Sequence, residues 1–338
     1  MQEALFYEKL AEGRVQCRLC PQQCRIAPGR HGICRVRKNV DGTLYSTNYG
    51  QTTSYAVDPT EKKPLYHFYP GSYLFSLGTL GCNFRCDFCQ NWQISQQDAP
   101  AETLLPREAL RLSEEVWRRE PRTIGIAYTY SEPSVWYEYV LDTARLARAT
   151  GLKNVLVTNG YIEREPLAEL LPVVDAMNVD VKAFSDDYYR RVCGGHLDPV
   201  LRTVEQAHQA GVHVEVTTLV VPALNDSDEE IGALVEWLAE VGEEIPYHLS
   251  RYFPNYQMDL PATPTTTLKR LRDLASQKLR YVYVGNLPSE GNNTYCYSCG
   301  ALLLRRDGLG VAESHLRDGH RCPRCGVEID IRGQVMVS

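Results

Sequence analysis

Hydrophobic and polar positions follow two rhythms along the middle of the chain. Short apolar runs bounded by turn residues predict buried strands, and longer stretches with apolar residues every three or four positions predict helices. The expected strands cover residues 72–79, 122–130, 153–160, 175–182, 212–221, 245–253 and 279–285. The expected helices cover residues 107–120, 134–150, 164–171, 199–210, 227–241 and 265–277.

This alternation is typical of parallel βα units and predicts an α/β fold. We expect residues 71–288 to form a partial barrel of the (β/α)6 type. Residues 1–70 are expected to form a cysteine-rich N-terminal module, and residues 289–338 a four-cysteine module of the zinc-ribbon or rubredoxin kind. In such a barrel the chemistry belongs at the carboxyl ends of the strands, where the βα loops begin.

Composition narrows the class of protein. The 338 residues carry a formal net charge of -6, which argues against a nucleic-acid partner because such a protein needs a basic face. Residues 1–17 lack the apolar core of a secretory signal. No apolar run approaches the roughly 18 residues of a membrane span. We therefore expect a cytoplasmic protein without a membrane partner.

Twelve cysteines in a chain without a visible secretory signal indicate metal ligands rather than disulfides. They form an N-terminal quartet (Cys17, Cys20, Cys24, Cys34), a triplet (Cys82, Cys86, Cys89), the single Cys193 and a C-terminal quartet (Cys296, Cys299, Cys322, Cys325). Each quartet supplies the four thiolates of a closed site. The triplet is therefore one ligand short, and Cys193 is the spare thiol.

The C-terminal quartet consists of two C-x-x-C-G turns, in which the glycine frees the backbone to fold around a metal. Zinc is the first choice, and rubredoxin-like iron is the alternative because "CPRCG" also resembles a rubredoxin knuckle. His315 and His320 lie between the two turns. With four thiolates present, we expect both histidines to be solvated.

The N-terminal quartet allows two kinds of metal centre. Its spacing fits a tetrahedral zinc site, which we place first, or an auxiliary iron–sulfur cluster, since both accept four thiolates. His31 lies close enough in sequence to replace one of the cysteines.

The triplet has a spacing of three and then two intervening residues, so one tight loop can aim three thiolates at one inorganic centre. Without a fourth protein ligand, one metal keeps an open position, which is typical of catalytic sites. Polar residues recur in or after the other predicted strands: Ser131, Glu132, Thr158, Asn159, Asp180, Lys182, Glu215, Thr217, His248 and Arg251. Taken singly, each of these residues also has a structural explanation. Asp180 and Lys182 could form a salt bridge, and His248 could be a hydrogen-bonded histidine in the core.

The segment "CNFRCDFC" resembles the C-x-x-x-C-x-aromatic-C signature of the radical SAM superfamily, with Phe88 as the aromatic residue. The resemblance implies a radical SAM barrel with a [4Fe-4S] cluster held by Cys82, Cys86 and Cys89. It also implies that S-adenosylmethionine (SAM) ligates the fourth iron and is cleaved reductively, so that a 5′-deoxyadenosyl radical abstracts hydrogen from a substrate. Such oxidoreductase-like chemistry implies anaerobic conditions and a flavodoxin- or ferredoxin-type electron donor.

More narrowly, "DPTEKKPLYHFYPGS", "AYTYSEP", "VTNGY", "VDVKAF" and "TTLVVPALND" resemble the AmmeMemoRadiSam system radical SAM enzyme, related to pyruvate formate-lyase activating enzymes. This implies possible partners from the same system. By the resemblance, the SAM contacts are Glu132 (amino group), Lys182 (carboxylate) and His248 (nucleoside), with Asn159 and Thr217 as polar contacts and Ser131, Thr158 and Asp180 as further candidates.

Two positions depart from the activating enzymes. Those enzymes usually carry Gly-Gly before the glutamate, whereas this chain has Tyr130 and Ser131 before Glu132. They also tend to carry an aspartate before "TNG", where this chain has Val157. The first departure concerns a backbone contact to SAM, and the second a monovalent cation site.

Three functions are compatible with the residues. The first is hydrogen abstraction from a small molecule, and the second is formation of a glycyl radical on a partner protein. The third is a metal-rich scaffold, which would not require an open triplet beside a set of strand-end polar residues. Cys193 is by default a buried structural thiol. The sharper alternative is a catalytic hydrogen-atom donor or substrate ligand.

Overall fold

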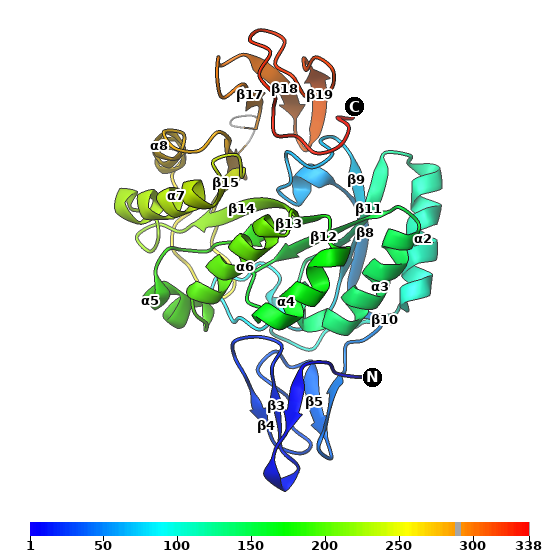
Figure 1. Cartoon of the computed structure of the whole chain (residues 1–338). Coiled ribbons are helices and arrows are strands. Elements are labelled where there is room, and N and C mark those ends of the chain that lie inside the picture. The colour runs from blue at the N-terminus through cyan, green and yellow to red at the C-terminus, as the bar shows by residue number, and fades with distance from the viewer. Residues whose placement is uncertain (288–291, 338) are drawn as a thin grey trace.

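The computed structural model describes residues 1–287 and 292–337, and its centre is an eight-stranded sheet in the order β16-β15-β14-β13-β12-β11-β9-β8 (Figure 1). Strands β9 to β16 of this sheet run parallel, and β8 is antiparallel to β9. The strands are β8 (Ser54–Pro59), β9 (Tyr73–Gly78), β11 (Thr123–Tyr128), β12 (Lys153–Thr158), β13 (Ala176–Asp180), β14 (His213–Val220), β15 (Tyr247–Arg251) and β16 (Val282–Gly285). The α/β partial-barrel prediction is confirmed.

Helices connect the parallel strands and pack against the sheet (Figure 1). The longer helices are α2 (Pro106–Arg119), α3 (Tyr137–Ala149), α4 (Arg164–Leu170), α6 (Asp198–Gln209), α7 (Asp228–Gly242) and α8 (Thr265–Ala275). The short ones are α1 (Trp92–Ser95), α5 (Asp186–Tyr188), the 3-10 turns η1 (Ala11–Gly13), η2 (Thr60–Lys62), η3 (Pro133–Trp136) and η4 (Leu171–Val173), and the π turn η5 (Tyr189–Cys193). The helix predicted over 134–150 begins as η3, where Pro133 presets the first turn.

Local sequence explains these elements. Strand β14 is rich in Val and Thr and is buried at seven of its eight positions, as expected for a strand covered on both faces. At the start of α7, the Ser227 hydroxyl accepts a 3.1 Å hydrogen bond from the Glu230 amide, and three acidic residues occupy the first turn. Both features stabilise a helix N-terminus.

The strand register brings the carboxyl ends of the strands to one edge of the sheet. Tyr128 on β11 pairs with Leu77 on β9 and with Leu156 on β12. Further along, Asp180 at the end of β13 pairs with Thr217 on β14. The loops that follow β9, β11, β12 and β13 therefore emerge side by side.

Strand β8 corrects the predicted module boundaries. It pairs with β9 from Ser54↔Gly78 to Pro59↔Tyr73, so the predicted boundary at residue 70 divides the central sheet. The predicted boundary at residue 288 lies outside the described residues. None of the helices in residues 1–287 and 292–337 has the length and hydrophobicity that a membrane span requires.

The N-terminal module consists of small antiparallel sheets at the end of the barrel that carries the βα loops (Figure 1). Its strands are β1 (Gln2–Glu3), β2 (Tyr7–Lys9), β3 (Val15–Cys17), β4 (Arg25–Ile26), β5 (Arg37–Val40) and β6 (Thr43–Ser46). A separate two-stranded sheet pairs β7 (Gln51–Thr52) with β10 (Glu102–Thr103). Gln22 Nε2 donates to Asn83 O at 3.0 Å and to Gly194 O at 2.7 Å. The module is thus fastened to the loop that carries the triplet.

The C-terminal module packs at the opposite end of the sheet and contains β17 (Thr294–Tyr295), β18 (Leu302–Asp307) and β19 (Gly310–Ser314) (Figure 1). Asp330 accepts hydrogen bonds from Arg280 and Tyr281, just before β16. Arg306 is buried against Glu61 and donates to Tyr66 O at 2.7 Å. These contacts fix the module to the segment of residues 60–70 and to the barrel edge.

Candidate functional site

A large cavity opens at the carboxyl ends of the strands. All three triplet cysteines line it, together with seven polar candidates: Ser131, Glu132, Thr158, Asn159, Asp180, Lys182 and Thr217. The structure therefore brings the three cysteines of the triplet together with most of the strand-end polar residues that the sequence singled out. His248, Glu215, Arg251 and Cys193 are not among the residues that line this cavity.

The triplet loop presents its thiols to hydrogen-bond donors. Cys82 Sγ accepts from the Phe84 amide at 3.4 Å and from Asn159 Nδ2 at 3.6 Å, and Cys89 Sγ lies 3.2 Å from Ser95 Oγ. Burial, with the nearby Glu132 carboxylate, raises the pKa of Cys82. The hydrogen bond with Cys193, supported by the Lys182 ammonium, lowers the pKa of Cys86. Hydrogen-bond donors thus face Cys82 and Cys89, and a cation lies near Cys86, but burial still raises the pKa of Cys82 and Cys89.

The residues present fit the cluster that the resemblance implies. Among the described residues, the triplet does not belong to any group of ligand atoms lying within 4.8 Å of one another, so its thiols are too far apart to share one ion. Three thiolates that bind three different irons are expected to stand further apart than three on one ion. In addition, the buried hydroxyl of Ser131 has no hydrogen-bond partner in the described part of the chain, although this residue lines the cavity.

Glu132 is buried at the end of β11 and is held by three donors. Its Oε1 accepts from the Ser134 amide at 2.9 Å and from Thr158 Oγ1 at 2.6 Å, and its Oε2 accepts from the Asn159 amide at 2.8 Å. Burial raises its pKa, although these hydrogen bonds act in the opposite direction. A carboxylate accepts up to about four hydrogen bonds, so Oε2 retains capacity for one further donor.

Asp180 and Lys182 form an ion pair, with Lys182 Nζ 2.9 Å from Asp180 Oδ2. Burial by itself lowers the pKa of Lys182, but Asp180, Cys86 and Cys193 together raise it well above its usual value. Lys182 therefore stays charged beside the triplet. The salt-bridge interpretation of this pair is correct as far as the geometry goes, and it is compatible with a ligand role because both residues line the cavity.

His248 lies within its strand, as expected. It is the second residue of β15, and its Nε2 lies 2.6 Å from Glu215 Oε2. It lines a second cavity with Tyr66, Glu61 and Arg306, at the open side of the barrel. This second cavity adjoins the main one, since Lys62, Thr217, Ser250 and Asn286 line both. The contact of His248 to the nucleoside of SAM stays a prediction.

Tyr130 occupies a position where the activating enzymes usually carry glycine, and the backbone explains that preference. Its φ is 69°, a left-handed conformation that favours glycine. Its hydroxyl donates to Asp58 Oδ2 at 2.6 Å, and Lys63 Nζ lies 4.5 Å from its ring centroid. Gly78 packs against the Tyr130 ring. A larger residue does not fit there, because a methyl group on Gly78 would approach the ring to 2.8 Å.

The wall formed by residues 58–63 adds two lysines that were not among the candidate site residues. Lys62 and Lys63 line the main cavity, and each donates to a different oxygen of Asp58 at 2.7 Å. Asn91 Nδ2 also lines the cavity and donates to Tyr130 O at 2.6 Å, which joins the triplet loop to this wall. The paired lysines in "DPTEKKP" were the available signal.

Cys193 is fully buried at the end of η5. Its carbonyl accepts from the Arg85 amide at 2.9 Å, within the triplet loop. Because it does not line the cavity, this placement favours the structural interpretation over a catalytic thiol.

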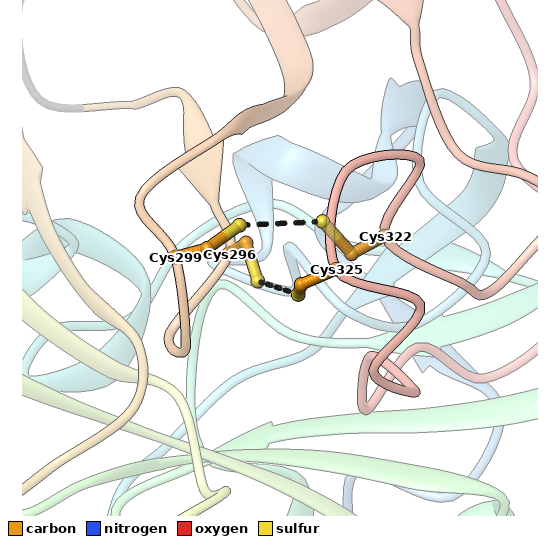
Figure 2. A group of neighbouring side chains, drawn as sticks. All are labelled: Cys296, Cys299, Cys322 and Cys325. Carbon is orange, nitrogen blue, oxygen red and sulfur yellow. Dashed lines mark hydrogen bonds between the residues drawn. The ribbon is translucent and has the colours of Figure 1, made fainter.

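The C-terminal quartet has the dimensions of a one-metal site (Figure 2). Two Sγ–Sγ distances are 3.6 Å, for Cys296 with Cys325 and for Cys299 with Cys322, and all four sulfurs lie within 4.8 Å of one another. A Zn–S bond of about 2.3 Å places tetrahedral thiolates roughly 3.8 Å apart. Neither His315 nor His320 belongs to the group. The choice of zinc over iron stays a prediction.

Residues 77–238 match the radical SAM superfamily. Over 98% of its length, the chain is 46% identical to an uncharacterised protein of Methanocaldococcus jannaschii, of which it covers 99%. The pyruvate formate-lyase 1-activating enzyme of Escherichia coli K12 is 26% identical over 50% of this chain and 71% of that enzyme. SuiB of Streptococcus suis, solved with SAM bound, has a TM-score of 0.52 at 12% identity, over 63% of this chain and 52% of SuiB, and supports the fold alone.

These matches agree with the geometry of the cavity. The family implies a [4Fe-4S] cluster and SAM, which the triplet and its polar neighbours fit. The narrower assignment to the AmmeMemoRadiSam branch, with partners from that system, stays a prediction. The chain is a radical SAM superfamily enzyme with homology to pyruvate formate-lyase activating enzymes.

Proposed function

We propose that this enzyme cleaves SAM reductively and abstracts a hydrogen atom from a small molecule. The observation that carries the proposal is that the open cysteine triplet and the Glu132–Lys182 polar set line one cavity. When bound, the cluster and SAM supply one-electron cleavage of the sulfonium C–S bond and a 5′-deoxyadenosyl radical. The protein supplies the positions of these groups and shields them from water.

Different polar residues bind different groups of SAM. Glu132 Oε2 accepts from the SAM ammonium, and Lys182 pairs with the SAM carboxylate beside Cys86. The unpartnered Ser131 hydroxyl adds a donor or acceptor at the same place. Asn159 holds the loop in register, since its Nδ2 donates to Asn83 Oδ1 at 2.9 Å, next to Cys82. A flavodoxin- or ferredoxin-type protein supplies the electron.

The walls of the cavity support a small substrate. The N-terminal module is fastened to the triplet loop through Gln22, and the wall of residues 58–63 is joined to that loop through Asn91 and Tyr130. Lys62, whose side chain is 48% exposed, stands at the rim as a cation. A molecule that reaches the reaction centre passes between these walls, which suits a compact substrate better than a folded protein.

The second candidate is formation of a glycyl radical on a partner protein. The observation that favours it is the homology with pyruvate formate-lyase activating enzymes. In this case a glycine-containing loop of the partner enters the cavity in place of a small molecule.

The experiment that separates the candidates measures 5′-deoxyadenosine and glycyl radicals together. Reduced enzyme is incubated anaerobically with SAM and fractionated metabolites below about 1 kDa, or with the corresponding protein fraction. We expect the small-molecule fraction to stimulate 5′-deoxyadenosine formation without a glycyl electron paramagnetic resonance (EPR) signal. Stimulation by the protein fraction alone, with a glycyl signal, would overturn the proposal in favour of the second candidate.

Lys182→Met is expected to weaken SAM binding by about one to two powers of ten, with cluster content unchanged, because a charge-assisted contact contributes about 1.5–3 kcal/mol. Glu132→Gln is expected to act in the same direction. Calorimetric titration of SAM into the reconstituted variants measures the effect.

The matched control is Lys153→Met. Lys153 also forms an ion pair in the sheet, with Nζ 3.2 Å from Asp175 Oδ1, but at the amino end of β12. Its removal is expected to cost less than about 1 kcal/mol of stability and to leave SAM affinity unchanged. Equal SAM affinity in wild type and both cavity variants would remove Glu132 and Lys182 from the site.

A further inference from the structure

The N-terminal quartet surrounds a cavity of its own. Cys17, Cys20, Cys24 and Cys34 all line it, and the remaining lining residues are Leu19, Ile26, Gly32, Ile33, Arg37 and Val135. Three of the four cysteines are buried, and Cys24 is half-buried. The proposed alternative ligand His31 is not among the lining residues. Four thiols therefore converge on one largely apolar space inside the module.

The spread of these thiols differs from that of the C-terminal quartet. The C-terminal sulfurs all lie within 4.8 Å of one another, which suits one ion. Within the described residues the N-terminal cysteines form no such group of three or more. A single tetrahedral zinc draws its thiolates to roughly 3.8 Å. Thiols that stand further apart around a common cavity are arranged for a centre with several metal atoms, each binding its own thiolate.

Two polar groups in the module are directed at the quartet. The Ile33 amide donates to Cys24 Sγ at 3.4 Å. The Arg37 side chain is 1% exposed, its Nη1 lies 4.0 Å from Cys17 Sγ, and its Nε has no hydrogen-bond partner in the described residues. Arg37 therefore places a buried positive charge beside the quartet, where it opposes the negative charge of four metal-bound thiolates. Glu138 pairs with Arg37 from α3 and holds it there.

We propose that the N-terminal quartet binds a second [4Fe-4S] cluster rather than a zinc ion. Four protein thiolates close its coordination, so this cluster has no open iron for SAM or substrate and is suited to carry electrons. The module also touches the triplet loop on two sides. Gln22 Nε2 donates to Asn83 O at 3.0 Å, and a methyl group on Gly81 would lie 2.5 Å from Cys34 O. The two cysteine sets are thus held by neighbouring segments.

The test counts metals in the full chain after anaerobic reconstitution with iron and sulfide in the presence of zinc. We expect about eight irons per chain, four for each [4Fe-4S] cluster, and about one zinc. In the Cys82→Ala/Cys86→Ala/Cys89→Ala variant we expect about four irons, with a reduced-state EPR signal that SAM does not change. This variant isolates the N-terminal centre, so the result does not depend on radical SAM activity.

Two further variants assign the iron. Cys20→Ala/Cys34→Ala is expected to lose about four irons and to keep the SAM-sensitive signal of the triplet. The control Cys299→Ala/Cys322→Ala is expected to lose zinc and no iron. If the first variant does not fold, the metal count of the wild type still decides. About four irons with two zincs per chain, or about six irons, would overturn the proposal.

Discussion

Replacing Cys82, Cys86 and Cys89 together with alanine is expected to abolish the formation of 5′-deoxyadenosine from SAM. The three thiols line the same cavity as Glu132 and Lys182, and no other cysteine lines it within the described residues. The loss is therefore expected to be complete, not partial, because the variant removes every thiol that lines this cavity within the described residues. Anaerobic incubation with dithionite and SAM, followed by chromatography of the nucleoside products, measures it.

The C-terminal metal is the internal control for this variant. Its quartet lies at the opposite end of the sheet (Figure 1), so its metal content is expected to match that of the wild type. Continued formation of 5′-deoxyadenosine by the triple variant would contradict the assignment of the triplet to the radical cluster.

The parallel strands could be predicted because their burial leaves a strong local pattern. The later parts of β12 (155–158) and β14 (216–220) are continuously apolar or β-branched, since both faces of the sheet are covered. Strand β8 alternates between half-buried and exposed positions over most of its length and ends in proline. It joins the sheet by long-range pairing with β9, and its own sequence does not indicate that partner.

The candidate site divides in the same way. Polar residues in the loops that follow strands, such as Glu132 and Asn159, could be placed because every parallel strand ends at the same edge. His248 was expected within its strand, but its hydrogen-bond partner could not be predicted, because that partner depends on where β15 begins. The strand starts at Tyr247, which puts His248 deep in the barrel beside Glu215. Lys62 and Lys63 were not among the candidate residues because their wall comes from a segment outside the βα repeat.

Glu215→Gln is expected to destabilise the protein by about 3–5 kcal/mol, since removing one partner from a buried charged network leaves the others unsatisfied. The Glu215 side chain is fully buried and accepts four hydrogen bonds. The amides of Tyr66 and His67 donate to different carboxylate oxygens, at 2.9 and 2.7 Å. A glutamine keeps one of these oxygens and replaces the other with an NH2 group. That NH2 group is a donor facing a backbone N–H donor, so one of the two hydrogen bonds that hold residues 66 and 67 is lost.

The pH dependence identifies the carboxylate as the cause. Burial by itself raises the pKa of Glu215, but the hydrogen bonds with His213 and His248 outweigh it and hold the pKa well below its usual value. A carboxyl group with a lowered pKa stabilises the fold above its unfolded-state pKa of about 4.3, and this contribution is lost as the pH falls through the lowered folded-state value. The difference in urea midpoint between wild type and Glu215→Gln is therefore expected to be full above about pH 5 and to shrink in more acidic solution. The control is Glu205→Gln, where a half-buried carboxylate accepts one 3.1 Å bond from Trp237, and we expect less than about 1 kcal/mol there at every pH. A pH-independent loss in Glu215→Gln would mean that side-chain packing, and not the charge of the carboxylate, holds the segment in the barrel.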